Sequence, residues 1–401
     1  MNHPPRDTWL SRRLQALSDE LSRHRVLWQH AAFRAPVLPW ESDYPQLATR
    51  LRALTLAEAE ALHGDPPASA ALLAGWLPVD RWLSLAAVAR ARPRPLVAWP
   101  RAFARDVPGR KWAQIDAFVA VLRDQAELPC LEWCSGKAHL ARALQQQWNG
   151  RRLSALERNP VLIAQGRELA RRHGMLIDMQ RCDVLDDEVL CHLAQPVHVV
   201  ALHACGDLHL RLLRCAVAAT LPAISCAPCC YHLGAAQHYQ ALSRAARASP
   251  LALGRGDLRT AVQETVTAPG HARRQRARMQ QWQLGFDLLQ REQRGIDEYL
   301  PPPSVSGAGD FAAYCRGAAQ FLQIALPSAV ALAGYESAGA ERFRVVSALD
   351  LVRHRFRRLL ELWLVLDRAL FLADHGYRVE VTEFCARELT PRNLLIQARA
   401  G

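Results

Sequence analysis

The sequence predicts an α/β protein built on one parallel β-sheet, with a helical region before the sheet and a helical insertion late in the chain. From residue 129 onward, short apolar runs alternate with segments long enough for one helix each. This alternation is typical of βαβ units, whose parallel strands are covered by helices on both faces. The composition agrees, because 50% of the 401 residues are hydrophobic and 22% are charged, which is enough to bury a large core.

Residues 1–105 are predicted to form a helical region without strands. Leucines recur there at helical spacing, and Pro66, Pro67 and Pro78 mark turns between the helices. The leucines are Leu10, Leu14, Leu17 and Leu21, then Leu47, Leu51, Leu54 and Leu62. An Arg- and Pro-rich stretch at 92–100 is interpreted as the connector to a second domain, residues 106–401.

Five apolar runs predict the parallel strands of the second domain, at 130–134, 153–156, 176–179, 198–202 and 223–226. Residues 233–346 break this rhythm and are expected to form a largely helical insertion after the fifth strand. A long helix at 349–375, ended by Gly376, then leads to closing strands at 377–384 and 393–399. A short loop joins these two, so they are expected to pair antiparallel, giving seven strands with the last one antiparallel.

The chain is basic, with a formal net charge of +12, and Lys111 and Lys137 are its only lysines. Arginine suits phosphate binding, although GC-rich codon usage explains the excess equally well. Two basic features stand out, the cluster Arg273–Arg278 in the insertion and the run Arg353–Arg358 in the long helix. Both are candidate contacts to a nucleic acid, and a solvated helix face is the simpler interpretation of the second.

Eleven cysteines, nine of them between Cys130 and Cys230, lie mostly among apolar residues. An odd number in this context indicates reduced thiols rather than a secreted disulfide framework. No run approaches the roughly 18 apolar residues of a membrane helix, and residues 1–10 lack the apolar centre of a signal peptide. The expected location is therefore the cytoplasm, without membrane contact.

Acidic and glycine residues follow the first three strands where a nucleotide-like ligand would bind. Gly136 directly follows the first strand and allows a tight turn into a helix, but the GxGxxG pattern of a pyrophosphate site is missing. Glu132 is suited to a ligand's amino group, and Glu157, which ends the second strand, to the hydroxyls of a ribose. Asp183, just past the third strand, is suited to an adenine amino group, with a helix N-terminal acid as the alternative.

Polar and sulfur side chains follow the fourth and fifth strands and are expected to face one crevice, because the ends of parallel strands share one edge. They are His203, Asp207, Cys229, Cys230, Tyr231 and His232. Asp207 is alternatively an N-cap. Thiols beside imidazoles can bind zinc, but Cys226-x2-Cys229 has no matching second pair, so no metal is expected. A thiol nucleophile is disfavoured as well, since buried cysteines are usually inert.

Five segments in order resemble the seven-strand S-adenosylmethionine-dependent methyltransferases, in particular the branch of methyltransferase-like and "ribosomal RNA adenine dimethylase domain-containing" proteins. The segments are VPGRKW (107–112), CSGKAHL (134–140), LHACGDL (202–208), PCCYH (228–232) and TPRN (390–393). The resemblance implies a Rossmann-like class I methyltransferase sheet that binds S-adenosylmethionine. The residues it implies for the cofactor are Glu132, Cys134, Gly136, Lys137, Glu157, Asp183 and His203. Those implied for catalysis on the acceptor side are Asp207, His203, Cys229, Tyr231 and His232.

Two residues depart from the family pattern, Trp133 in place of a small residue and Ala138 in place of the second glycine. The sequence is also similar to tRNA 2′-O-methyltransferases, but residues 1–105 lack the cysteines of their zinc module. Arg392 and Asn393 begin the last strand, either beside the crevice or only tying the closing hairpin.

The leading hypothesis is an RNA methyltransferase acting on rRNA or tRNA. The alternatives are a methyltransferase of a protein or small molecule and a non-catalytic scaffold that binds S-adenosylmethionine. Nicotinamide-dependent redox chemistry is disfavoured by the missing glycines.

Overall fold

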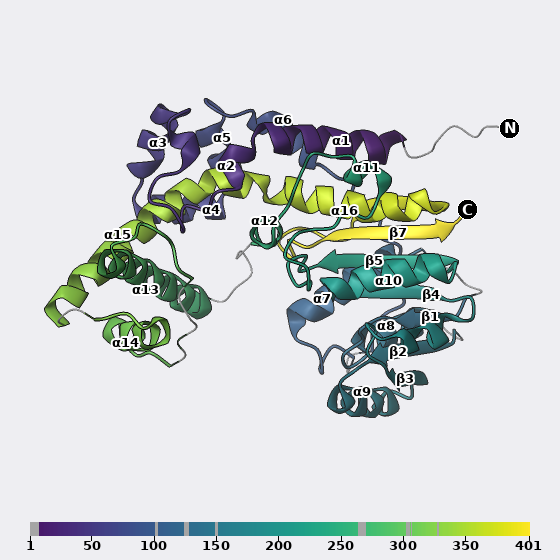
Figure 1. Ribbon diagram of the computed structural model, residues 1–401. Coiled ribbons are helices and arrows are strands. Elements are labelled where there is room, and N and C mark those ends of the chain that lie inside the picture. The colour runs from purple at the N-terminus through teal and green to yellow at the C-terminus, as the bar shows by residue number, and fades with distance from the viewer. Residues whose placement is uncertain are drawn as a thin grey trace. The chain divides into compact units, whose positions relative to one another are not determined.

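The computed structural model describes residues 8–100, 103–123, 128–148, 151–263, 270–301, 305, 307–326 and 329–401. The chain divides into two compact units (Figure 1). The first unit comprises Met1–Arg23, Ser84–Glu264 and Arg357–Gly401, and the second comprises His24–Leu83 and Thr265–Phe356. The domain boundary expected at residue 105 stays a prediction.

The first unit contains a seven-stranded sheet with the strand order β3-β2-β1-β4-β5-β7-β6. Strands β1 to β5 pair in parallel, and β7 runs antiparallel to both β5 and β6. The fold predicted from the sequence is confirmed. The strands are β1 (Cys130–Glu132), β2 (Leu153–Glu157), β3 (Ile177–Arg181), β4 (His198–Cys205), β5 (Ala223–Cys229), β6 (Tyr377–Glu383) and β7 (Leu394–Ala400).

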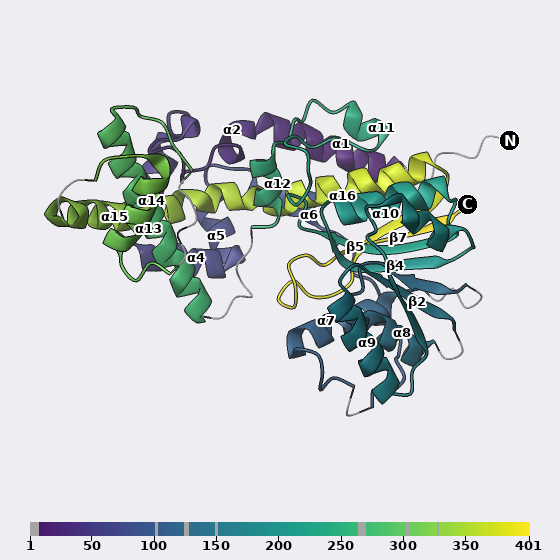
Figure 2. The same ribbon diagram turned by 60° about the horizontal axis from the view of Figure 1, so that its bottom comes forward.

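Helices cover both faces of this sheet, as the apolar strands require (Figure 2). On one face lie α7 (Gly109–Val121), α8 (His139–Gln147) and α9 (Pro160–Arg172), and on the other lie α10 (Asp207–Ala218) and α16 (Arg357–Asp374). A short 3₁₀ helix, η2 (Asp187–Leu193), follows β3. The carboxyl ends of the five parallel strands, β1 to β5, therefore lie at one common edge of the sheet.

The first helix of the chain, α1 (Thr8–Arg23), packs along α16 on the outside of this layer. Its predicted leucines Leu10, Leu14, Leu17 and Leu21 are buried. The Trp363 indole N–H donates a hydrogen bond to Ser18 Oγ at 2.8 Å. After α6 (Val79–Ala86), residues 87–100 contain no helix and a single bridge, between Arg90 and Glu383. These residues lie within the first unit, and their predicted role as a turn-rich connector between domains stays a prediction.

The segment after β5 is tied to α16 by one buried carboxylate. Asp367 accepts hydrogen bonds from the backbone of Leu242 (2.9 Å), from the backbone of Ser243 (2.7 Å), and from the hydroxyls of Ser243 and Tyr239. This segment carries the short helices α11 (Arg244–Arg247) and α12 (Arg255–Ala261). Because buried donors left without an acceptor are costly, Asp367 fixes the path of the chain after β5.

The second unit is helical, and its core includes the buried aromatic residues Trp282, Phe286 and Tyr314. The buried carboxylate of Asp287 in its interior is paired with Arg291 and Arg342. Its helices are α2 (Arg25–Trp28), α3 (Pro45–Arg52), α4 (Leu56–Gly64), α5 (Pro66–Leu73), α13 (Gly270–Arg294), α14 (Phe311–Leu322) and α15 (Ala329–Arg353), with a 3₁₀ turn, η1 (Pro39–Glu41). Among the helices described, none combines the length and apolar composition needed to cross a membrane.

The single helix predicted at 349–375 is wrong in one respect. Helix α15 ends at Arg353, a 3₁₀ turn, η3 (His354–Phe356), follows, and α16 begins at Arg357. The turn places the fully buried ring of Phe356 against Trp82, with ring centroids 4.4 Å apart. A 3₁₀ turn shifts the helical phase while the hydrophobic spacing continues, so periodicity alone does not reveal the break.

Candidate active site

Non-glycine residues with a left-handed backbone conformation are concentrated near the ends of β1, β4 and β5. Of the six non-glycine residues with positive φ in the described chain, four lie there. They are Cys134 (φ 58°), Ala138 (φ 53°), His203 (φ 61°) and Cys230 (φ 47°). Such a conformation costs an L-residue roughly 1–2 kcal/mol, and strain of this kind clusters at functional sites. Four residues at the carboxyl edge of the sheet thus hold energetically unfavourable backbone conformations, which set the directions of their side chains.

Gly136 and Glu157 are joined by a direct hydrogen bond. The Gly136 N–H donates to Glu157 Oε2 at 2.9 Å, and the Asn159 N–H donates to Oε1 of the same carboxylate at 2.9 Å. Gly136 has a left-handed φ of 59°, and no heavy atom lies within 4 Å of the position that a β-carbon would take there. The loop after β1 therefore turns tightly beside the carboxylate that ends β2, and it leaves open space in front of its glycine. Lys137 follows in the same loop and is partly exposed.

The two residues that depart from the family pattern both face inward. Ala138 precedes α8 in a left-handed conformation and is fully buried against Ala155 and Met179. Trp133 is 1% exposed, and its indole N–H donates to the Leu208 carbonyl at 3.0 Å. Neither side chain fills the open space at Gly136, so the scaffold hypothesis gains no support from them.

Glu132, the last residue of β1, is a buried carboxyl group. Its Oε2 accepts a hydrogen bond from the Ala141 N–H at 2.9 Å, near the start of α8. Burial raises the pKa of Glu132 to about 8, against the pull of that hydrogen bond and of Lys111. The negative charge of the nearby Glu157 carboxylate contributes to this raised pKa. Such a group is protonated near neutral pH, and a cation placed beside it would draw the proton off.

Asp183 follows β3, and its carboxylate accepts a hydrogen bond from the Leu185 N–H at 3.1 Å. The exposed Arg158 lies 3.5 Å from its other oxygen. Asp183 is not the cap of a helix, because η2 begins after Asp186. Cys134 lies close to both acids: its pKa is raised to about 12 by burial, and Glu157 and Asp183 contribute. The ends of β1, β2 and β3 therefore gather the cofactor-side residues predicted from the sequence.

His203 lies at a β-bulge of β4, where the register with β5 shifts between Leu202 and Ala204. A bulge re-aims a side chain, and here the imidazole meets Gln114 of α7, with His203 Nε2 and Gln114 Oε1 3.0 Å apart. Because a carboxamide oxygen only accepts, Nε2 carries the proton. Burial, together with the positive charge of Arg392, lowers the pKa of His203 to about 4. The ring is therefore neutral and keeps a free lone pair on Nδ1.

Asp207 is the first residue of α10, after the N-cap Gly206. Its Oδ2 accepts a hydrogen bond from the Ala235 N–H at 2.8 Å. A carboxylate at a helix N-terminus is favoured by the helix dipole. The contacts of Asp207 thus anchor the segment after β5 to the loop after β4, and its predicted catalytic role stays a prediction.

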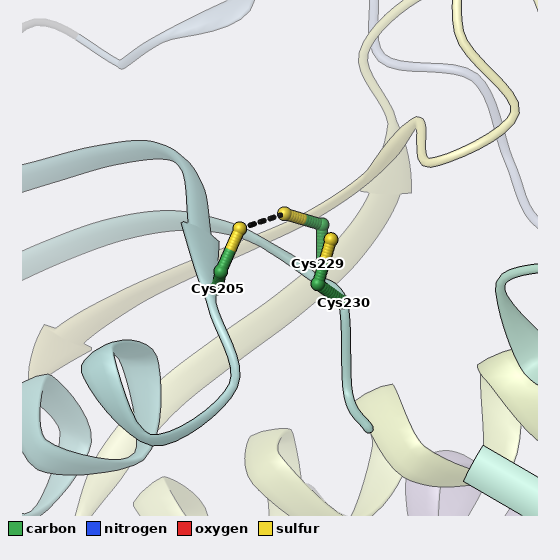
Figure 3. Close-up of side chains that lie close together, drawn as sticks. All are labelled: Cys205, Cys229 and Cys230. Carbon is green, nitrogen blue, oxygen red and sulfur yellow. Dashed lines mark hydrogen bonds between the residues drawn. The ribbon is translucent and has the colours of Figure 1, made fainter. Parts of the chain in front are cut away.

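Three thiols meet at the ends of β4 and β5 (Figure 3). Cys205 and Cys229 stand opposite each other in the parallel register, with their sulfur atoms 3.3 Å apart. Hydrogen bonds from the thiols of Cys205 and Cys229 lower the pKa of Cys230. The pKa of Cys229 is instead raised by the hydrogen bonds that Cys229 makes with Cys205 and Cys230, and burial raises it as well. The cluster therefore favours one thiolate, on Cys230, solvated by two thiol donors.

Tyr231 and His232 follow the thiols but differ in position. Tyr231 is 4% exposed, and its hydroxyl donates to the Pro228 carbonyl at 3.3 Å. The guanidinium of Arg368 in α16 lies 4.9 Å from its ring. Tyr231 thus packs in the core beneath α16, and its ring is almost completely shielded from solvent. His232 is half-buried, and its Nδ1 has no hydrogen-bond partner among the described residues.

Arg392 and Asn393 perform different tasks at the closing hairpin. The Asn393 side chain donates to the Cys385 carbonyl at 2.7 Å and ties the hairpin together. The charge of Arg392 acts instead on His203 and Cys230, and its Nη1 is buried with no hydrogen-bond partner in the described chain.

Sequence reasoning missed two residues of this site. Gln114 orients His203 from a helix far earlier in the chain, and its only signal is its place one turn after Lys111. Cys205 lies within the segment LHACGDL, but the spacing Cys226-x2-Cys229 points to Cys226 as the partner of Cys229 instead. The rule that neighbouring parallel strands end at one edge could have found Cys205.

Residues 110–237 match the model of a family described as a methyltransferase domain. The matched range contains α7 except for its first residue, β1 to β5, and the candidate site residues described above except Arg392 and Asn393 of the closing hairpin. A search of the curated proteins finds no match. With the seven-stranded sheet and its strand order, the match places a Rossmann-like methyltransferase domain in this chain.

Proposed function

We propose that this methyltransferase domain uses S-adenosylmethionine and transfers its methyl group to an RNA. The observation that carries the cofactor assignment is the hydrogen bond between the Gly136 N–H and Glu157, in a left-handed turn that faces open space. A nucleoside with no pyrophosphate needs one such turn rather than three glycines. The residues at this edge therefore fit the methyl donor better than a dinucleotide.

The order of three carboxyl groups along the edge of the sheet supports this assignment. The sheet places β3, β2 and β1 side by side, roughly 5 Å apart, so Asp183, Glu157 and Glu132 follow one another along the edge. The adenine, ribose and amino-acid parts of S-adenosylmethionine follow one another in the same order. Asp183 would accept from the adenine amino group, Glu157 from the ribose hydroxyls, and Glu132 would face the ammonium group.

The bound donor would supply a sulfonium methyl group, which leaves as the acceptor's lone pair attacks the methyl carbon. The protein needs to hold the acceptor in line with the methyl group and to take up a proton that the acceptor loses. His203 suits the second task, because it is neutral and its Nε2–H is already committed to Gln114. Its Nδ1 lone pair is left to accept the proton.

The basic start of α13 supports RNA as the acceptor. Arg273, Arg274, Arg276 and Arg278 are all exposed. By contrast, arginines of the second basic run bond within the protein: Arg353 donates to the Trp28 carbonyl, and Arg358 pairs with Glu361 and Glu383. The first cluster is thus the better candidate for phosphate contacts. We propose rRNA or tRNA as the acceptor class, in keeping with the narrower family resemblance.

The test is transfer of a tritium-labelled methyl group from S-adenosylmethionine into separated total RNA, protein and metabolite fractions. We expect label in RNA, and RNA binding whose affinity falls steeply with salt. Arg273→Gln with Arg276→Gln should flatten the slope of log affinity against log salt by about 0.7 to 0.9 per lost phosphate contact. The matched control, Arg12→Gln with Arg50→Gln, removes the same charge from exposed positions elsewhere and should leave the slope unchanged. Label confined to protein or metabolites would overturn the RNA assignment while keeping the methyltransferase.

A further inference from the structure

The three thiols of Cys205, Cys229 and Cys230 form the densest group of metal-ligating side chains in the described part of the chain. Their three sulfur atoms all lie within 4.8 Å of one another (Figure 3). Cys229 is buried, whereas Cys205 and Cys230 are partly exposed. The group therefore combines a protected interior with an entry path from solvent, and methyl transfer as described above makes no use of it.

The fold builds this cluster in two steps. The bulge of β4 between Leu202 and Ala204 sets the register that places Cys205 opposite Cys229. In an extended strand, the side chains of Cys229 and Cys230 would point to opposite faces. The left-handed φ of 47° at Cys230 breaks that alternation, and its sulfur returns to the side of the other two (Figure 3).

The sulfur spacing fits a tetrahedral zinc ion. Zinc binds thiolate sulfur at about 2.3 Å, so sulfurs on a tetrahedron around it lie about 3.8 Å apart. Here the closest pair is at 3.3 Å and no pair exceeds 4.8 Å. Side-chain shifts of less than about 1 Å bring all three sulfurs to zinc distance.

We propose that Cys205, Cys229 and Cys230 bind one Zn²⁺ as thiolates at the ends of β4 and β5, with the fourth position of the tetrahedron left for a water molecule. Three protein ligands with an open fourth position are the arrangement of catalytic rather than structural zinc sites. The ion displaces the thiol protons to solvent. Three thiolates and Zn²⁺ carry a net charge of −1, and the positive charge of Arg392, which acts on Cys230, would partly offset it.

The pair that the sequence spacing singles out, Cys226 and Cys229, is not the ligand pair. Cys226 lies fully buried inside β5 and does not belong to the cluster. The proposed site also goes beyond the proposed methyl transfer and does not rest on it.

The test uses the full-length protein, reduced and stripped of metal, with Zn²⁺ and Co²⁺ as probes. We expect one Zn²⁺ per chain by elemental analysis after gel filtration, and thiolate-to-cobalt charge-transfer absorption with intense tetrahedral d–d bands on adding Co²⁺. Alkylation mapped by mass spectrometry gives a second readout that needs no variant. Zn²⁺ should protect the partly exposed Cys205 and Cys230, while the exposed Cys191 continues to react.

Variants locate the ion on the proposed ligands. Cys205→Ser and Cys230→Ser should each abolish the charge-transfer band, whereas Cys191→Ser, which removes an exposed thiol outside the cluster, should leave it unchanged. If a variant fails to fold, the alkylation pattern of the wild-type protein decides the question. Cobalt spectra without thiolate absorption, alkylation unaffected by Zn²⁺, or a Cys205–Cys229 disulfide that persists in reductant would each overturn the proposal.

Discussion

Glu132 should make cofactor affinity depend on pH. Burial raises the pKa of this carboxyl group to about 8, whereas the ammonium group of the ligand requires a carboxylate opposite it. The ligand's α-amino group has an ordinary pKa of roughly 7.7–8.0, so it is still largely protonated at pH 7. Between pH 6 and pH 7 the ionised fraction of Glu132 rises from about 1% to about 9%. Affinity should therefore rise about eightfold over that unit, or about 1.2 kcal/mol.

The measurement is calorimetric titration with S-adenosylhomocysteine, which occupies the same site without turnover, at pH 6.0, 6.5, 7.0 and 7.5. Glu132→Gln is the matched control. Its carboxamide oxygen still accepts from the Ala141 N–H, but it does not ionise in this range. The variant should bind more weakly at pH 7.5 and show nearly constant affinity between pH 6 and 7. Wild-type affinity that is flat across this unit would refute the role given to Glu132.

Four further predictions follow, the first three of them from the same edge of the sheet. The pKa of Glu132 in the folded protein is raised from 4.5 to about 8. The stability that this group contributes is therefore fully present below pH 4.5 and is lost as the pH rises to 8. In urea unfolding, the free energy of unfolding of Glu132→Gln relative to that of the wild type should increase by up to about 5 kcal/mol between pH 4.5 and pH 8. Glu157→Ala should lower S-adenosylhomocysteine affinity by about 10- to 150-fold, the equivalent of one hydrogen bond to a charged group at about 1.5–3 kcal/mol; Glu168→Ala, which removes an exposed carboxylate of α9, should not change it. Gly206→Ala should abolish cofactor binding or folding by calorimetry and circular dichroism, because its φ is +52° and a β-carbon would lie 1.8 Å from a backbone oxygen. Gly256→Ala, with open space in a helix, should stabilise the protein by about 0.5–1 kcal/mol.

The strand starts could be predicted because buried parallel strands are continuous apolar runs. The ends of β4 and β5 could not, since β4 continues through His203 to Cys205 and β5 through Pro228 to Cys229. In β4, a β-bulge accommodates His203 between Leu202 and Ala204. Because polar residues and proline are not typical of a central strand, the sequence suggests that both strands end earlier than they do. The missing residues are the ones that bring the thiols of the two strands together.

The sequence placed Gly136 after the first strand and Glu157 at the end of the second strand, but the hydrogen bond between them is a finding of the structure. The contact of His203 with Gln114 could not be predicted either, because it joins segments 89 residues apart through a helix whose orientation the spacing does not fix. Tyr231 shows that the position of a residue after a strand does not fix where its side chain lies. Its place after β5 suggested the crevice, but the backbone turns at Cys230, and the ring packs beneath Arg368 in the core.

The central claim is that the carboxyl edge of β1, β2 and β3 binds S-adenosylmethionine. It is tested most directly by calorimetric titration of the wild-type protein with S-adenosylhomocysteine, with NADH as the comparison ligand. The account predicts one S-adenosylhomocysteine bound per chain and no binding of NADH. Absence of S-adenosylhomocysteine binding at a ligand concentration of about 1 mM, which limits the binding free energy to less than about 4 kcal/mol, would contradict it, as would binding of NADH.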